Sequence, residues 1–178
     1  TISFNGTDGL AVLAAVQRAD FSVNRFDSNI ALGVDLSPDG VNAIDTDSGA
    51  VGANGGQNFP VLLNAGGGDN AGTVGGRLQS ANGNYDITLY RSTSCDASGY
   101  GEAGVLVGGG GVAITNGTAT TDGEVLFNLP VSYTSSLDGR AITALATERG
   151  GAEDGNTSEF SACIEYTSVE LFSDGFEP

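Results

Sequence analysis

The chain has 178 residues, enough for one or two small domains. It carries 22 acidic and 6 basic residues, a formal net charge of −16, and it contains no His, Met or Trp. Because such an acidic surface repels the phosphate backbone of nucleic acids, we expect no nucleic-acid partner. All basic residues are arginines. The lack of His and Lys excludes imidazole triads and dyads, Schiff-base lysines and the P-loop.

Two features of the sequence indicate its compartment. No run of apolar or glycine residues, neither 9–16 nor any other, is long enough to span a bilayer. The chain begins at Thr1, and we expect it to be a mature or excised piece of a longer precursor. An even count of cysteines, Cys95 and Cys163, in an acidic, lysine-free chain favours a disulfide outside the cytoplasm, with two buried free thiols as the alternative.

Residues 1–65 consist of short apolar segments separated by Asn, Asp and Gly, which are corner residues. An apolar pattern recurs after 22 residues: Phe4, Leu10 and Val12, then Phe26, Leu32 and Val34. This spacing is the length of one solenoid coil, so we predict β-helix-like coils closed by the Asp- and Gly-rich loop 37–56. A helix over residues 10–18 is the alternative, because AVLAAVQR contains good helix formers.

The remainder of the chain has the pattern of an antiparallel β-sandwich. Residues 66–72 are expected to form a Gly-rich joint, residues 73–166 an Ig-like sandwich and residues 167–178 a tail. Alternating apolar residues predict strands near 85–90 and 125–129, and further strands are expected at 105–107, 112–115, 141–147 and 158–166. Asn116-Gly117 and Asp122-Gly123 are strong turn signals, and Pro130 is expected to end its strand. The predicted fold class is therefore all-β.

Four stretches together resemble a known family of proteins. They are GVDLSPDGVN…QNFPVL (33–62), SCDASGYGEAGVLVG (94–108), TTDGEVLFNLP (120–130) and ITALATERGGAEDGNTSEFSAC (142–163). They resemble the C-terminal region of secreted bacterial right-handed parallel β-helix surface proteins of the CSLREA type, which end in an Ig-like sandwich. The ending LFSDGFE (171–177) is similar to short endings of secreted gammaproteobacterial proteins.

The resemblance implies a secreted or cell-surface location in a Gram-negative bacterium and a pairing of Cys95 with Cys163. It implies no specific activity. The sequence departs from the family pattern in the loop AIDTDSGAVGANGG and in an insertion at 149–154, so ion binding at these loops is less strongly implied.

The best candidate for a metal site is a group of aspartates in one Gly-rich loop: Asp35, Asp39, Asp45 and Asp47. Calcium prefers six to eight oxygen ligands, and such a loop can wrap around the ion. It is no EF-hand, because position 12 counted from Asp45 is Gly56 instead of Glu. Calcium is therefore the candidate cofactor, and a solvated acidic turn is the alternative.

A second acidic group, Glu148, Glu153, Asp154 and Glu159, surrounds the last predicted hairpin. Asp154 and Asn156 are a weaker calcium candidate, and an ordinary charged loop is the favoured interpretation. Paired carboxylates leave a glycosidase formally open, but the chain lacks the Trp platforms that sugar clefts use. Arg18 and Arg25 are the only candidates for a lyase base, and solvated surface arginines are the more common case.

The predicted coils dictate the functional hypothesis. Two coils leave an open edge of unpaired backbone groups, at Ile2, Phe4, Leu10 and Val12, and solenoids need further repeats or a cap. We expect upstream coils or a neighbouring subunit to cover it, making the chain a non-enzymatic filament subunit or part of an adhesin. The alternatives are a calcium-dependent carbohydrate or adhesion module, and a remnant of a β-helix polysaccharide lyase or hydrolase.

Overall fold

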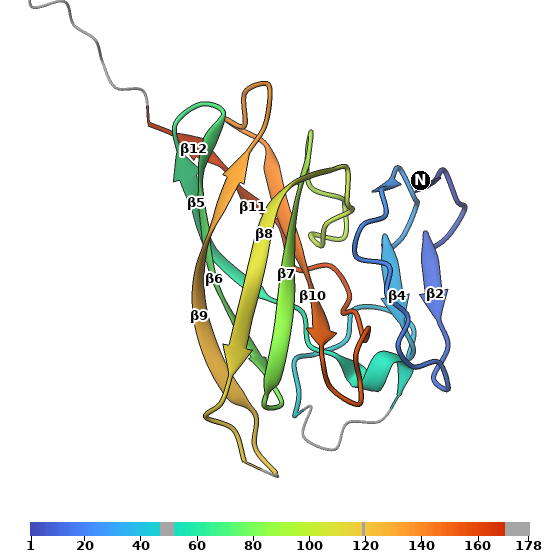
Figure 1. The fold of residues 1–178 in the computed structure, drawn as a ribbon. Helices are drawn as coiled ribbons and strands as arrows, with labels where there is room; N and C mark the ends of the chain where they lie inside the picture. Colours follow the sequence, from blue (N-terminus) through green and yellow to red (C-terminus); the bar gives the residue numbers. More distant parts are fainter. Residues whose placement is uncertain (47–51, 119, 170–178) are drawn as a thin grey trace, which may run out of the picture.

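The computed structural model describes residues 1–46, 52–118 and 120–169 (Figure 1). These residues form strands and loops with one short 3-10 turn, η1 (Ala53–Gly56), which confirms the all-β prediction. None of the described residues belongs to a helix of the length and apolarity needed to cross a membrane.

The N-terminal part is a stack of two parallel coils. Coil 1 (residues 1–16) contains β1 (Ile2–Ser3) and β2 (Leu10–Val12), and coil 2 (residues 25–40) contains β3 (Phe26–Asp27) and β4 (Val34–Leu36). β1 pairs with β3 and β2 with β4, both in parallel. The predicted strand-and-corner pattern is present in both coils, but the strand also predicted at 21–23 is a turn, and the alternative of a helix over residues 10–18 is wrong.

The repeat is longer than the apolar pattern suggested. Ile2 lies opposite Phe26 and Leu10 opposite Val34, so the register is 24 residues and the predicted 22 is wrong. The corners obey the same period: Phe4 and Ser28 both adopt a left-handed backbone, with φ of 59° and 61°. The apolar pattern had aligned Phe4 with Phe26. In the structure Phe4 instead corresponds to Ser28, because both residues form the corner of their coil.

The second part is a β-sandwich of mostly antiparallel strands, with two short strands at the ends of its sheet. Its strands are β5 (Val61–Gly67), β6 (Ala71–Ser80), β7 (Gly83–Ser92), β8 (Val105–Ile114), β9 (Gly123–Ser132), β10 (Ala141–Arg149), β11 (Ile164–Glu165) and β12 (Thr167–Ser168). Their order is β11-β10-β7-β8-β9-β6-β5-β12, and among the described residues β8 and β9 are paired only at Gly108 and Val131. The sheet therefore folds over into two layers (Figure 1).

Several predicted boundaries are wrong for local reasons. The proposed joint 66–72 is the β5–β6 hairpin, so the sandwich begins at Val61, and residues 167–168 of the proposed tail form β12. The glycines 108–111 belong to β8, which joins the two short strands predicted at 105–107 and 112–115. Glycine is required at position 108, because a side chain there would collide with the carbonyl oxygen of Pro130 in β9. β9 runs through Pro130 to Ser132, and only residues 164–165 of the strand expected at 158–166 form a regular strand.

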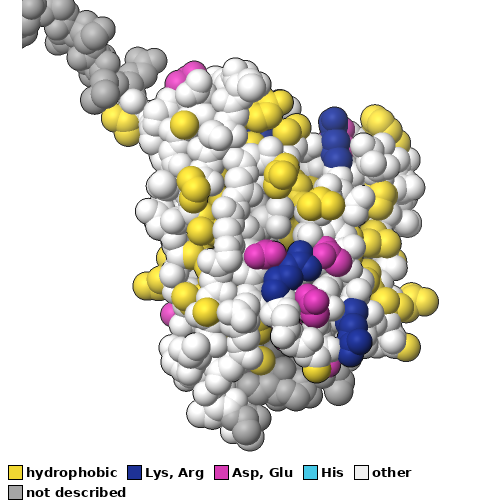
Figure 2. Space-filling model, viewed as in Figure 1, with side chains coloured by type: hydrophobic (Ala, Val, Ile, Leu, Met, Phe, Trp, Pro, Cys, Tyr) yellow, Lys and Arg dark blue, Asp and Glu magenta, His cyan; other side chains and the backbone are white. Residues whose placement is uncertain are grey.

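Two apolar clusters hold the molecule together. One fills the sandwich. The other joins coils to sandwich: Phe26 of coil 2 packs edge-to-face on Phe160, with ring centroids 5.5 Å apart, and Phe160 packs on Tyr90 of β7 in the same way. The coils and the sandwich therefore share one core and are not separated by a linker. Exposed apolar side chains remain along the outer side of the coils (Figure 2).

The predicted disulfide is present. Cys95, in the loop after β7, is bonded to Cys163, just before β11, with 5.9 Å between their Cα atoms. The bridge ties the 93–104 loop, which carries Glu102, to the strand segment that carries Glu159. It therefore fixes the relative position of the two carboxylates that contact coil 2, described next.

Candidate functional site

The two ends of the coil stack differ in how their backbone groups are satisfied. Alternate residues of a parallel strand direct their N–H and C=O groups to opposite edges. In coil 2 one edge faces coil 1, and the other faces the sandwich. On that side the N–H of Phe26 donates to the carbonyl oxygen of Ala103, at 2.9 Å. The sandwich thus occupies the position that a third coil would take.

Glu102 also takes the place of a third coil, at the corner of coil 2. Asn5 and Asn29 lie one above the other, and the backbone N–H and the side-chain amide of Asn5 donate to Asn29 Oδ1, at 3.2 and 2.8 Å. The same two groups of Asn29 donate to Glu102 Oε1, at 2.9 and 2.7 Å. Asn29 and Glu102 are both buried. The carboxylate ends a ladder of asparagine side chains that runs in one direction.

Glu159 performs the same role at the other strand of coil 2. Its Oε1 accepts the N–H of Leu36, and its Oε2 accepts the N–H of Asn42, both at 2.9 Å. The side chain is almost completely buried. Burial first, and then the nearby charges of Asp35 and Asp8, raise the pKa of Glu159 to about 7 against the opposing effect of the two backbone hydrogen bonds.

The outer edge of coil 1 has no such cap. Among the described residues, no strand pairs with β1 or β2 other than those of coil 2. Ile2 and Leu10, which stack on buried residues of coil 2, are themselves only half-buried, and Val12 is buried. Phe4, Leu13 and Val16 are exposed, Phe4 to 80%. Three of the four residues predicted for assembly therefore line the interior of the stack, and Phe4 projects from its corner.

The predicted calcium ligands are only partly brought together. The carboxylates of Asp35 and Asp39 lie with that of Asp8, a residue that the sequence did not suggest, all within 4.8 Å of one another. Asp45 lies apart, with its N–H bonded to Asn58, and Asp47 lies outside the described residues. Burial, followed by the charges of Asp8 and Asp39, raises the pKa of Asp35. Three acidic side chains could contribute oxygen ligands to a cation here.

The second acidic group does not form a ligand set. Asn156 is buried and accepts the N–H of Arg18 through Oδ1 while its amide donates to Glu153, which assigns it a structural role. Asp154 is exposed. Burial, with the charges of Glu153 and Asp154, raises the pKa of Glu148. Glu159 lies apart from this group, on coil 2. Of the two arginines considered for a lyase, Arg25 pairs with Asp27 at 3.0 Å.

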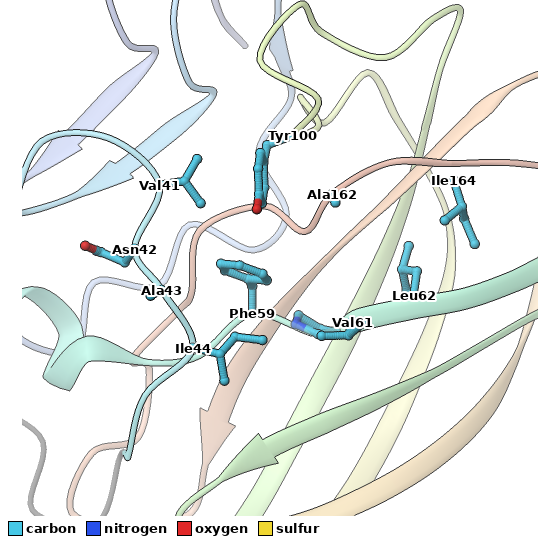
Figure 3. A pocket seen from close by; sticks show the side chains of 11 residues that line it. Val41, Asn42, Ala43, Ile44, Phe59, Val61, Leu62, Tyr100, Ala162 and Ile164 are labelled. Atoms are coloured by element: carbon cyan, nitrogen blue, oxygen red, sulfur yellow. The ribbon is translucent and has the colours of Figure 1, made fainter.

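An apolar groove lies at the coil–sandwich junction, next to the Glu159 cap, since Asn42 lines the groove and donates to Glu159 (Figure 3). Its volume is about 520 Å³, and its lining comes from the loop after coil 2, from the start of β5, from Tyr100 and from the chain around β11. Phe59 and Tyr100 form an edge-to-face pair on its floor, with centroids 5.7 Å apart. β5 is paired with β12 only at Gly66 and Gly67, so the described residues leave Val61 and Leu62 without a strand partner on the groove side.

The sequence did not indicate the capping role of Glu102 and Glu159, although Glu159 was among the acidic residues around the last predicted hairpin. Glu102 and Glu159 are 73 and 123 residues from the groups they accept, Asn29 and Leu36, and no local pattern indicates such contacts. The Asn5–Asn29 ladder had a signal, because both asparagines follow the left-handed corners at a spacing of 24 residues. An alignment by corner residues in place of apolar residues would have found it.

A scan of the chain against protein-family models gave no match, and a search of curated proteins by sequence gave none. The site is therefore interpreted from its own geometry.

Replacement of Glu102 tests the cap. Glu102→Ala leaves the backbone N–H and the amide of Asn29 buried without an acceptor, so we expect a loss of roughly 2–4 kcal/mol in the free energy of unfolding. Glu102→Gln keeps a carbonyl oxygen at the same position and should lose less than about 1.5 kcal/mol. Urea denaturation measures both, and hydrogen exchange at Asn29 reports the local effect. Equal losses for the two variants would contradict the capping role.

Glu159 predicts a pH dependence of stability. Its folded pKa of about 7 lies above its ordinary value of 4.5, so between these values the folded chain binds more protons than the unfolded chain. The free energy of unfolding should therefore fall as pH rises from about 4.5 to 7, by roughly 3 kcal/mol from this group alone. Glu159→Gln cannot titrate and provides the reference. If the difference between wild type and Glu159→Gln stays constant from pH 4 to 8, the prediction is wrong.

Proposed function

We propose that the chain is a non-enzymatic structural module of an extracellular bacterial surface protein, and that it self-assembles by addition of β-structure to the free edge of coil 1. The observation that carries this proposal is the asymmetry of the stack. One side of coil 2 is capped by Ala103, Glu102 and Glu159, and the outer side of coil 1 has no strand partner among the described residues.

An open strand edge is a strong driving force for association. Its unpaired N–H and C=O groups are a template for another strand, and soluble proteins cover, shorten or charge such edges. Coil 1 keeps its edge strands short, at two residues in β1 and three in β2, but it neither covers nor charges them, and its only charged side chain is Asp8. Ile2 and Leu10 would gain full burial from a partner laid over them, which favours association through the hydrophobic effect.

Composition supports the extracellular part of the proposal. The disulfide between Cys95 and Cys163 is typical of oxidising compartments. A net charge of −16 keeps a polymer of such subunits dispersed in solution through mutual repulsion. The resemblance to secreted β-helix surface proteins favours the same location. In an adhesin of that kind, additional coils would cover the edge that a neighbouring subunit covers in a filament.

The proposal predicts concentration-dependent assembly of the purified chain. Sedimentation velocity should detect species larger than the monomer, and negative-stain microscopy should show whether they are fibres or rings. Hydrogen exchange should slow at Ser3 and Ala11, whose amides alternate with the paired amides of Ile2 and Leu10 and so face outward. If the chain remains monomeric at all accessible concentrations, the proposal is wrong.

A calcium-dependent adhesion module is the second candidate, and the convergence of Asp8, Asp35 and Asp39 favours it. Three carboxylates this close repel one another, and Asp35 is buried as well. A divalent cation would remove this repulsion and offer the hard charge that carboxylate oxygens bind.

Calcium should then raise the melting temperature of the wild-type chain, and EDTA should reverse the rise. Asp39→Asn reduces the site by one charge while leaving the hydrogen bond from Gly40 to Asp35 in place, so it should weaken the calcium response at least several-fold. Magnesium at the same concentration is the control for general charge screening. An equal response to both ions would argue against a calcium site.

A further inference from the structure

Phe4 is an unusual residue for its position. The corner of each coil requires a left-handed backbone, and Asn or Gly are the residues that adopt it readily. Coil 2 uses Ser28 at this corner, but coil 1 uses Phe4, a bulky residue for which φ of 59° is unfavourable. The ring is 80% exposed, so contacts within the chain do not compensate for this strain. Strain of this kind is common where a residue serves an external contact.

The edge that carries Phe4 is also unusually free of charge. In a chain of net charge −16, coil 1 has one acidic side chain, Asp8, and it also exposes the apolar side chains of Leu13 and Val16, which follow β2. Elsewhere on the molecule, two copies would repel each other at short range. With one charged side chain on coil 1, the repulsion between copies is reduced at this edge, and the exposed apolar side chains favour burial.

The groove beside β5 has matching properties. None of its lining residues is charged, and they are mostly apolar: Val41, Asn42, Ala43, Ile44, Phe59, Pro60, Val61, Leu62, Tyr100, Ala162 and Ile164. Its volume of about 520 Å³ accommodates an aromatic side chain together with a neighbouring aliphatic one. Phe59 and Tyr100 offer ring edges and faces to a further aromatic ring, the arrangement that aromatic side chains prefer (Figure 3).

We infer that Phe4 of one copy inserts into the groove beside β5 of a second copy, and that this contact joins subunits head to tail. The inference rests on the proposed function and names the surface that receives the free edge. The donor surface, coil 1, and the acceptor surface, the groove, share no residue. Each subunit therefore keeps one free donor and one free acceptor, and the contact propagates unless the rotation closes a ring.

The direction of the asparagine ladder argues against a two-fold pairing of coil 1 with itself. Asn5 donates to Asn29, and Asn29 donates to Glu102, so the group left at the outer rung is the acceptor Asn5 Oδ1. Two copies joined edge to edge about a two-fold axis would bring two like ends of the ladder together, so the Asn-to-Asn hydrogen bonds could not continue in one direction across the contact. A different surface, such as the groove, avoids this conflict.

Two substitutions separate the donor from the acceptor. Phe4→Asn places a residue suited to the left-handed corner, so the monomer should keep or gain stability while the association constant falls at least tenfold. Ala43→Glu puts a charge on an exposed groove residue and should cause a similar loss. Val23→Asn removes another exposed apolar side chain outside both surfaces, and Ala97→Glu adds a matched charge elsewhere; both should assemble like wild type.

A mixing experiment gives the decisive result. Phe4→Asn retains an intact groove, and Ala43→Glu retains an intact Phe4, so a mixture of the two should form a 1:1 heterodimer that cannot grow, detectable by sedimentation velocity. A mixture that remains monomeric, or variants that assemble like wild type, would overturn this inference and leave self-assembly standing. A wild-type chain that does not assemble at all would instead refute the proposed function.

Discussion

The structure depends on one constraint: every N–H at the end of a stack of parallel coils needs an acceptor. Coil 2 meets it with groups that lie far away in sequence, the carboxylates of Glu102 and Glu159 and the carbonyl oxygen of Ala103. A carboxylate suits this role because one oxygen accepts two donors, as Glu102 Oε1 does from Asn29. The buried negative charge is an unfavourable component of this solution, and it is expressed in the raised pKa of Glu159.

These caps require the sandwich to be held firmly against the coils. Phe26, Phe160 and Tyr90 form a continuous line of edge-to-face rings from coil 2 into β7, and the Cys95–Cys163 bridge fixes the two segments that carry the caps. On the surface, Arg149 of β10 bridges Asp20, in the loop after coil 1, and Asp86 of β7. The sandwich thus acts as a rigid cap for the stack. Two coils alone would be too few for stability, and the cap compensates for the missing repeats.

The sequence predicts elements whose cause is local and misses contacts whose cause is distant. Tyr85, Ile87 and Leu89 alternate in the sequence, and all three are buried inside β7. The Asn116-Gly117 and Asp122-Gly123 signals both fall in the single β8–β9 connection. In contrast, the period of 24 was hidden because apolar residues occupy different places in the two coils. The acidic cluster was half predicted, since Asp8 joins Asp35 only through the coil register, and the groove has no local signature in the sequence.

The same register that builds the stack also gives it a direction. Each asparagine of the ladder donates towards the sandwich. At the capped end Glu102 accepts the last hydrogen bonds, and at the outer end Asn5 Oδ1 remains as an acceptor. A stack with this polarity has two chemically different ends, and only one of them is closed by the chain itself. A surface that continues the ladder in the same direction has to differ from the outer end itself, and such a contact between unlike ends permits growth in one direction. Phe4, with its unfavourable left-handed backbone, lies at that outer end, and its exposed side chain can be buried only by the surface that completes the stack.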